Sequence, residues 1–210
     1  MSHYFTQNID GLDKIAGVSD EKLIQVHGSF DSNHCPVCKE SVNHDLVIEA
    51  MQDGEPLQCP TCLINGETTC SWIKPDITFF GEALPDKFYK VFDSDALEKC
   101  DLLIIIGTSL QVGPSNFIPL LVPEHCPRLL INREPAGDQN HFKWITDEDK
   151  TFLEQENIPI QCRDAFLKSD ADAGCLVLAE ALGMKTELEE RFVQKCKDLH
   201  YGLNELANFI

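Results

Sequence analysis

Two Cys-x-x-Cys pairs constrain the fold of this chain more than any other feature. They are Cys35-Pro-Val-Cys38 and Cys59-Pro-Thr-Cys62, with twenty residues between them. Each pair is short enough for both sulfurs to face one ion, and four thiolates complete a tetrahedral shell that leaves no position for water. The spacing therefore predicts a structural zinc site with all four cysteines as ligands. Disulfides or redox-active dithiols are the alternative interpretation.

The chain length and the other cysteines favour one main domain with a small metal-stapled insertion. A chain of 210 residues can bury a substantial core. Five further cysteines lie in apolar or helical stretches without paired spacing, and we expect them to be reduced core residues. They are Cys100, Cys126, Cys162, Cys175 and Cys196.

Charge and hydropathy exclude several classes of protein. Acidic residues at 10, 13, 20 and 21 interrupt any apolar run near the start, so no signal-peptide pattern is present. No stretch approaches the roughly 20 apolar residues that span a bilayer. The chain is therefore expected to be soluble and intracellular, with no membrane partner. A formal net charge of −18 argues against direct binding to nucleic acid and suits a cationic partner, although charge alone selects none.

Alternating strand and helix patterns predict an α/β fold. Residues 101–107 and 128–132 are continuous branched-apolar runs, which is typical of parallel strands covered by helices on both faces. Helical patterns occupy residues 86–99, 170–182 and 186–201. We therefore expect a mainly parallel sheet with helices on both faces.

Small polar residues follow three of the apolar runs. They lie at 6–11 after Tyr4-Phe5, at 107–109 and at 132–134, and the stretch 134–150 has the composition of a surface loop. Ligands of open α/β sheets bind beyond the carboxyl ends of the strands. Three such loops together predict a polar ligand of some length.

Six motifs in this order resemble the sirtuins, the NAD-dependent protein lysine deacylases. The matching stretches run from about residue 3 to Gly183: Thr-Gln-Asn-Ile-Asp-Gly-Leu at 6–12, Val-His-Gly-Ser at 26–29, the two cysteine pairs, Lys-Pro-Asp-Ile-Thr-Phe-Phe-Gly-Glu at 74–82, Gly-Thr-Ser-Leu-Gln-Val at 107–112 and Leu-Ile-Asn-Arg-Glu at 130–134.

The resemblance implies a division of the chain into three parts. A Rossmann-like NAD-binding domain would comprise residues 1–34 and 71–185. A zinc-binding module would occupy residues 35–70, and a C-terminal helical tail residues 186–210.

The resemblance also implies an activity, namely NAD-dependent removal of acetyl or other acyl groups from protein lysines. Nicotinamide and O-acyl-ADP-ribose would be released, which places the enzyme among the transferases. Substrates would be acetylated lysine-containing proteins, such as histone tails or cytoskeletal proteins, in the cytoplasm, the nucleus or both. NAD would be the co-substrate and zinc a structural metal.

His27 is the expected catalytic base. Imidazole titrates near neutral pH and can take and return a proton. By resemblance, it deprotonates a hydroxyl of the nicotinamide-bearing ribose after the acyl oxygen has displaced nicotinamide. From spacing alone, a histidine before Gly-Ser is more often a surface or capping residue.

The loop after the first apolar run is expected to hold the nicotinamide end of the cofactor. By resemblance, Asn8 and Asp10 hold the nicotinamide and its ribose, with Gln7 and Ile9 beside them. An Asx turn closed by Gly11 is the structural alternative, and the two interpretations are compatible.

The remaining expected cofactor residues follow the later strands. By resemblance, Gly107, Thr108 and Ser109 meet ribose or phosphate, although Ser and Thr there also suit a helix cap. The residues expected at the adenosine end of the cofactor are Asn132, Arg133, Glu134 and Ala171, the last through its backbone.

The stretch 77–82 is expected to bind the substrate. By resemblance, Ile77, Thr78 and Phe79 line an apolar tunnel for the acylated lysine, and residues 79–82, with Gly81 and Glu82, form a strand that pairs with the peptide. Core packing is the alternative, above all for Phe80.

Two other functions remain open. Sirtuins normally have a strand, a Gly-Ala-Gly loop and an Arg-bearing loop upstream of the segment that begins here at Thr6. We therefore also consider a catalytically impaired sirtuin-like protein that binds peptides. A zinc-stapled interaction module is the third candidate.

Overall fold

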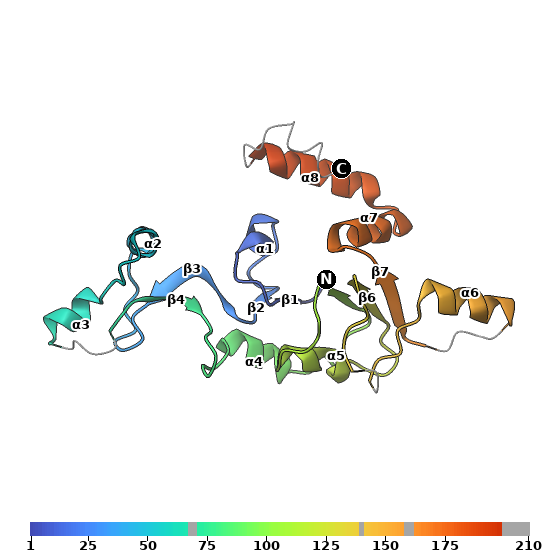
Figure 1. The fold of residues 1–210 in the computed structure, drawn as a ribbon, viewed down its shortest axis with the longest axis horizontal. Helices are drawn as coiled ribbons and strands as arrows, with labels where there is room; N and C mark the ends of the chain where they lie inside the picture. Colours follow the sequence, from blue (N-terminus) through green and yellow to red (C-terminus); the bar gives the residue numbers. More distant parts are fainter. Residues whose placement is uncertain (67–70, 139–140, 158–161, 199–210) are drawn as a thin grey trace. The chain divides into compact units, whose positions relative to one another are not determined.

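The computed structural model describes residues 1–66, 71–138, 141–157 and 162–198, and Figure 1 shows the ribbon. The chain forms two compact units, Met1–Asp93 and Ser94–Ile210. The first unit contains β1 (Tyr4–Thr6), α1 (Leu12–Ile15), β2 (Leu23–Gln25), β3 (Gly28–His34), α2 (His44–Asp53), α3 (Pro60–Ile64), β4 (Lys74–Ile77) and α4 (Asp86–Phe92). The second contains β5 (Leu103–Ile106), the 3₁₀ helix η1 (Ser115–Phe117), α5 (Ile118–Leu121), β6 (Arg128–Asn132), α6 (Asp147–Gln155), β7 (Asp164–Lys168), α7 (Ala171–Ala181) and α8 (Lys185–Asp198).

Two small sheets organise the first unit. Strands β1 and β2 are parallel, and their register pairs Thr6 with Gln25. Strands β3 and β4 are antiparallel, with Gly28 opposite Ile77 and His34 opposite Lys74. The buried apolar side chains of β2 and the aromatic ring of Phe88 from α4 supply core around the parallel pair. The parallel pair therefore aligns the carboxyl ends of two strands.

Gly28 permits the close approach of β3 and β4. Its φ is +73°, in the region that glycine adopts without strain, and a Cβ at this position would lie 1.9 Å from the carbonyl oxygen of Asp76. No other residue fits there without moving the backbone. The close pairing of the two strands therefore requires a glycine directly after His27.

The second unit is built on a three-stranded parallel sheet with strand order β5-β6-β7. Ile105, Leu130 and Phe166 project from the three strands into one buried cluster, which Trp144 also contacts. On the other face α7 approaches β6 closely, since a Cβ on Gly174 would lie 2.2 Å from Cγ2 of Ile131. The α/β class and the parallel pairing predicted from the sequence are confirmed.

Burial of β5 is less complete than its apolar pattern predicts. Ile105 points into the core, but Ile104 and Ile106 are 40% and 42% exposed. β5 is an edge strand of this sheet, and α7 lies against the neighbouring β6. Alternate side chains of β5 therefore remain open to solvent on one side.

The element bounds agree with the sequence in part. β6 has the predicted bounds, and α7 and α8 match their predicted helices apart from their ends, with residues 199–201 outside the described part of the chain. The helix predicted at 86–99 ends at Phe92 as α4. The stretch 134–150 is not wholly a loop, because α6 begins at Asp147 behind a capping box formed by Thr146 and Asp149. β7 was not predicted.

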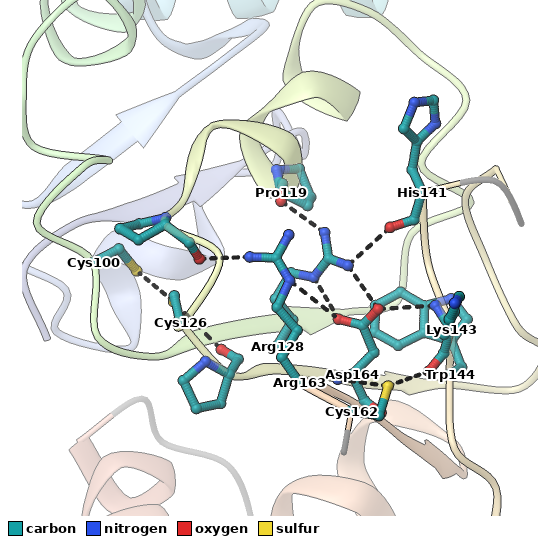
Figure 2. Close-up of polar contacts among 12 residues, drawn as sticks. Cys100, Pro119, Cys126, Arg128, His141, Lys143, Trp144, Cys162, Arg163 and Asp164 are labelled. Atoms are coloured by element: carbon teal, nitrogen blue, oxygen red, sulfur yellow. Dashed lines mark hydrogen bonds and ion pairs between the residues drawn. The ribbon is translucent and has the colours of Figure 1, made fainter.

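A buried ion pair lies at the amino ends of β6 and β7, where the register places Arg128 opposite Asp164 (Figure 2). Nε and Nη2 of Arg128 each lie 2.6 Å from a carboxylate oxygen of Asp164, and the two side chains are 1% and 4% exposed. The guanidinium also donates to the carbonyl oxygens of Pro119 and His141, both at 2.9 Å. All three guanidinium nitrogens therefore donate hydrogen bonds, as suits a buried charge.

Further contacts connect this pair to the loop that precedes α6. The backbone N–H of Lys143 donates to Asp164 Oδ2 at 2.9 Å. The ring of Phe142 stacks on Trp144 and lies 4.4 Å from the guanidinium carbon of Arg128. The ion pair thus joins both strands, α5 and the segment 141–144.

Among the described residues, no helix combines the length and the apolar character needed to cross a membrane.

Replacing Arg128 by Met should destabilise the protein by about 3–5 kcal/mol, because the Asp164 carboxylate would remain buried without its partner. Denaturant unfolding followed by circular dichroism measures the change. The double variant Arg128→Met/Asp164→Leu should recover much of the loss. Arg191→Met, which removes an exposed ion pair with Glu187, serves as control and should cost less than about 1 kcal/mol. Equal losses in Arg128→Met and Arg191→Met would contradict the role given to the buried pair.

Candidate metal and cofactor sites

The four predicted metal ligands lie together in the first unit. The sulfurs of Cys35, Cys38, Cys59 and Cys62 all lie within 4.8 Å of one another. The Cys35–Cys62 and Cys38–Cys59 sulfur pairs are each 3.6 Å apart, and three of the four residues are buried. This donor set and spacing fit a tetrahedral metal such as zinc. The predicted four-cysteine cluster is confirmed, although residues 67–70 of the predicted module lie outside the described residues.

Short turns within each Cys-x-x-Cys pair bring its two sulfurs close together. Cys59 precedes α3 as its N-cap, with Pro60 in the first helical position, and Cys62 follows one turn later. In the other pair the backbone N–H of Lys39 donates to the carbonyl oxygen of Cys35 at 2.9 Å, which closes a tight turn around Cys38. Both Cys-x-x-Cys pairs are therefore shaped by their own short turns.

The electrostatics of the bare cluster also favour a cation. Burial opposes ionisation of Cys35, but hydrogen bonds from the backbone of Cys38 and Val37 outweigh it and lower the pKa of this thiol to about 6. Burial and the neighbouring thiols raise the pKa of Cys62 to about 12. Ionised sulfurs this close together would repel one another, and a bound divalent metal would offset that repulsion.

The core of this region is small. Besides three cysteines, the described residues of its buried apolar cluster are Val47 and Ile73, with Val42 and Leu57 packed against it. So few side chains supply little hydrophobic stabilisation. A bound metal would therefore be a main source of stability here.

His27 and the loop at 7–10 lie at one edge of the first unit. Because Thr6 pairs with Gln25, the residues that follow β1 and β2 leave the same edge of the parallel pair. His27 is half-buried, and its carbonyl oxygen accepts a hydrogen bond from the N–H of Thr78 at 2.9 Å. The structure therefore brings together the expected base and the expected nicotinamide loop.

Short turns shape that loop. The N–H of Asn8 donates to Thr6 Oγ1 at 3.2 Å, and the Asp10 carboxylate accepts from the N–H of Leu12 at 3.1 Å. Gly11 follows with a positive φ of 73° as the N-cap of α1. The Asx turn considered from the sequence is thus present at Asp10. Asn8 and Asp10 are exposed, whereas Ile9 is half-buried.

The expected adenosine and phosphate residues form a second group, within the second unit. Gly107 to Ser109 follow β5. Asn132 is the last residue of β6, and Arg133 and Glu134 follow it. The side-chain amide of Asn132 donates to the carbonyl oxygens of Thr108 at 3.2 Å and of Glu134 at 2.9 Å, which joins the two loops. Apart from Gly107 and its two chain neighbours, no described residue has an atom within 4 Å of where a Cβ on Gly107 would be, so the backbone there has room for a ligand.

The loop after β7 lies beside this group. The N–H of Ser169 donates to the carbonyl oxygen of Asn132 at 3.0 Å, and Arg133 forms an ion pair with Asp170, the N-cap of α7. Ala171 is the first residue of that helix. Three consecutive parallel strands therefore bring the expected residues of the second unit to one edge of the sheet.

The segment expected to pair with substrate differs from its prediction. β4 ends at Ile77, and residues 79–82 form a turn in which the N–H of Glu82 donates to the carbonyl oxygen of Phe79 at 3.0 Å. The strand expected at 79–82 is therefore wrong. Phe80 is fully exposed, which also excludes core packing for this side chain.

Lys74 organises this turn, and sequence reasoning did not single it out. Its ammonium donates to the carbonyl oxygen of Ile77 at 2.7 Å and to Glu82 at 2.9 Å, and it lies 4.5 Å from the centre of the Phe79 ring. The Glu82 carboxylate also accepts from the N–H of Phe79 at 2.9 Å. The sequence feature that could have pointed to Lys74 was its position at the start of the motif 74–82.

Comparison with known proteins places the chain in a protein family. Residues 1–114 match the Sir2 family. The chain belongs to the Sir2 family, and the resemblance to sirtuins is thereby confirmed.

Several curated relatives are similar along much of the chain. It is 38% identical over 196 residues to NAD-dependent protein deacetylase sirtuin-2 of Danio rerio, which covers 89% of this chain and 47% of that protein. It is 36% identical over 186 residues to NAD-dependent protein deacetylase hst2 of Schizosaccharomyces pombe, with 89% and 48% covered. A match to HST1 of Saccharomyces cerevisiae is 40% identical over 153 residues, with 62% and 30% covered. The chain therefore spans about half the length of the first two relatives and 30% of the length of the third.

Substitution of Cys62 by Ser should remove the bound metal. We expect the wild-type chain purified with zinc to hold one zinc ion, because four thiolates complete the shell. The variant should lose zinc, and amides of α2 and α3 should then exchange faster with solvent, because the apolar core among the described residues of the module is small. Atomic absorption and hydrogen exchange measure the two effects. Cys175→Ser, in α7, is the matched control, and equal zinc content in all three proteins would refute the assignment.

Lys74→Met should raise the pKa of Glu82. In the wild type, the hydrogen bond from the N–H of Phe79 and then the Lys74 ammonium hold the pKa of this carboxyl below its ordinary value. The variant should move it only part of the way back, because the Phe79 N–H remains.

The sign of the pH dependence follows from the lowered pKa. The contribution of Glu82 to the stability of the turn is complete above the ordinary carboxyl pKa, and it is lost as pH falls through the lowered value in the folded state. A titration by NMR of the Glu82 side chain measures this. Asp149, whose pKa is lowered by Thr146, is an internal control that should not change. An unchanged Glu82 titration in Lys74→Met would show that the contact has no effect.

Proposed function

We propose that this chain carries out NAD-dependent removal of acetyl groups from protein lysines, with release of nicotinamide and O-acyl-ADP-ribose. The observation that carries the proposal is the position of His27 at the same strand edge as residues 7–10, in a chain of the Sir2 family. The relatives named above are protein deacetylases that depend on NAD. The reaction needs a base near the sugar that loses nicotinamide, and His27 is suited to that role.

His27 would act on the hydroxyl of the nicotinamide-bearing ribose. Its backbone is held by the hydrogen bond from Thr78 to its carbonyl oxygen and by the close approach of Gly28 to the backbone of Asp76. A fixed backbone limits where the imidazole can lie, which favours proton transfer at one atom. Gln7, Asn8, Ile9 and Asp10 would bind the nicotinamide and its ribose, since their loop is held in shape by Asp10 and Gly11.

The loops of the second unit would bind the rest of NAD, which supplies the electrophilic sugar carbon for the reaction. Open backbone at Gly107 and the hydroxyls of Thr108 and Ser109 suit phosphate or ribose oxygens. The side-chain amide of Asn132 donates both of its hydrogens to backbone carbonyl oxygens, so we assign this residue mainly to positioning the loop. Its Oδ1 would accept a hydrogen bond from a ribose hydroxyl. The adenosine end would also meet Arg133, Glu134 and the backbone of Ala171.

The turn after β4 would receive the acetylated lysine. Ile77, Thr78 and Phe79 provide mostly apolar surface, while Gly81 and Glu82 close the turn around Lys74. We propose acetylated lysine-containing proteins, such as histone tails or cytoskeletal proteins, as substrates in the nucleus, the cytoplasm or both. The net charge of −18 supports recognition of basic peptides.

The proposed organisation has three parts. An NAD-binding domain comprises residues 1–34 and 71–185, the zinc-binding module residues 35–70, and the tail residues 186–210. The small cysteine-rich core supports a separate role for the module. The proposed metal is structural, because the four thiolates would leave no position for a reacting water.

His27→Ala should reduce the release of nicotinamide from NAD and an acetyl-lysine peptide by about 10²–10⁴-fold, because the base is lost. Chromatography of nicotinamide and mass spectrometry of the peptide measure the two products. His125→Ala, which changes an exposed histidine before β6, is the control and should retain wild-type activity. Peptide binding by a wild-type chain that releases no nicotinamide would overturn the proposed activity in favour of a peptide-binding role.

A further inference from the structure

Cys100 and Cys126 lie side by side at the amino ends of two neighbouring strands. Cys100 precedes β5 and Cys126 precedes β6, and the register pairs Leu103 with Arg128. Neighbouring strands lie about 4.8 Å apart, so residues ahead of paired positions remain close. The two sulfurs are 3.7 Å apart (Figure 2). Strand pairing thus brings together two thiols that are 26 positions apart in the sequence.

The two thiols have different environments. The Cys126 side chain is fully buried and donates to the sulfur of Cys100, whereas Cys100 is half-buried and also directs its thiol to the carbonyl oxygen of Leu102 at 3.2 Å. Burial, followed by the contact with Cys100, raises the pKa of the Cys126 thiol to about 11. Cys100 is therefore the sulfur that a small oxidant in solution reaches first.

We propose that Cys100 and Cys126 are a redox-active pair that forms a reversible disulfide on reaction with hydrogen peroxide. The sulfurs already lie in van der Waals contact at 3.7 Å, and the spacing of adjacent strands suits the Cα separation of a disulfide. The proposal does not depend on the proposed deacetylase activity.

The chemistry balances with one peroxide per pair. The Cys100 thiolate attacks a peroxide oxygen, the O–O bond breaks, and a sulfenic acid forms with release of hydroxide, which takes up the thiol proton as water. The Cys126 sulfur then attacks the Cys100 sulfur. The S–S bond forms, the S–O bond breaks, and the departing hydroxide leaves as water with the proton of Cys126. Two thiols are oxidised, and hydrogen peroxide is reduced to two waters.

A link at this position would close the segment 101–125 into a loop. That segment contains β5 and residues 107–109, and the disulfide would fix the start of β5 against the start of β6. It would lie at the amino edge of the sheet, whereas the expected cofactor loops leave the carboxyl edge. Oxidation would therefore constrain this segment without consuming a residue assigned to cofactor or substrate.

A tryptic digest tests the pair directly. Lys and Arg are absent between Cys100 and Pro127, so trypsin releases a single peptide, Cys100–Arg128, that contains both cysteines and no other. The zinc-loaded chain is treated with increasing peroxide, alkylated with iodoacetamide and digested, while a chromogenic chelator reports zinc release. We expect this peptide to lose two hydrogen atoms and to take no alkyl group at peroxide doses that leave zinc bound. Dithiothreitol should restore two alkylation sites.

Variants separate this link from other cysteine oxidation. Cys100→Ser and Cys126→Ser should each abolish the loss of two hydrogens. Cys162→Ser should not, because the Cys162 thiol, located ahead of β7, is directed to the carbonyl oxygen of Lys143 at 2.9 Å. The proposal is overturned if the wild-type peptide keeps two alkylation sites until zinc is released. Oxidation of Cys100 to sulfinic acid without a link would overturn it as well.

Discussion

The second unit depends on the register between β6 and β7, and the ion pair of Arg128 with Asp164 fixes that register at its first position. A shift of either strand by one residue would send these charges to the opposite face and leave each unpaired in a buried place, which costs several kcal/mol. The same guanidinium binds two carbonyl oxygens from outside the sheet. One side chain thereby sets both the alignment of the strands and the packing of the segments around their amino ends.

Register at the amino edge determines geometry at the carboxyl edge. Once Arg128 faces Asp164, Asn132 must face Lys168, and the loops after β5, β6 and β7 leave the sheet together. The hydrogen bond from Asn132 to Thr108 then becomes possible. The buried charges and the loops expected to bind the cofactor thus lie at opposite ends of the same strands.

How much of this could be predicted depended on the range of the interactions. The four metal ligands and the bounds of β6 follow from local signals, namely Cys-x-x-Cys spacing and one continuous apolar run. β7 was missed because its sequence Asp-Ala-Phe-Leu-Lys has too few apolar residues, and its Asp164 is buried only because Arg128 pairs with it. The turn at 79–82 was missed for a similar reason, since it depends on Lys74 several residues upstream. Motifs thus predicted which loops matter, whereas contacts between residues distant in the sequence determine the conformations of these loops.

The cysteines show the same difference between features that a local motif encodes and features that depend on contacts across the fold. In Cys35-Pro-Val-Cys38 the two sulfurs are gathered by a single turn, so the spacing alone predicts a shared ligand. Cys100 and Cys126 have no such spacing and were expected to be ordinary core residues, yet their sulfurs are as close as those of the metal cluster. Their proximity comes from parallel pairing, which no short motif encodes. The chemistry open to each set differs accordingly, because four converging thiolates can surround a cation, whereas two neighbouring thiols can form one bond with each other.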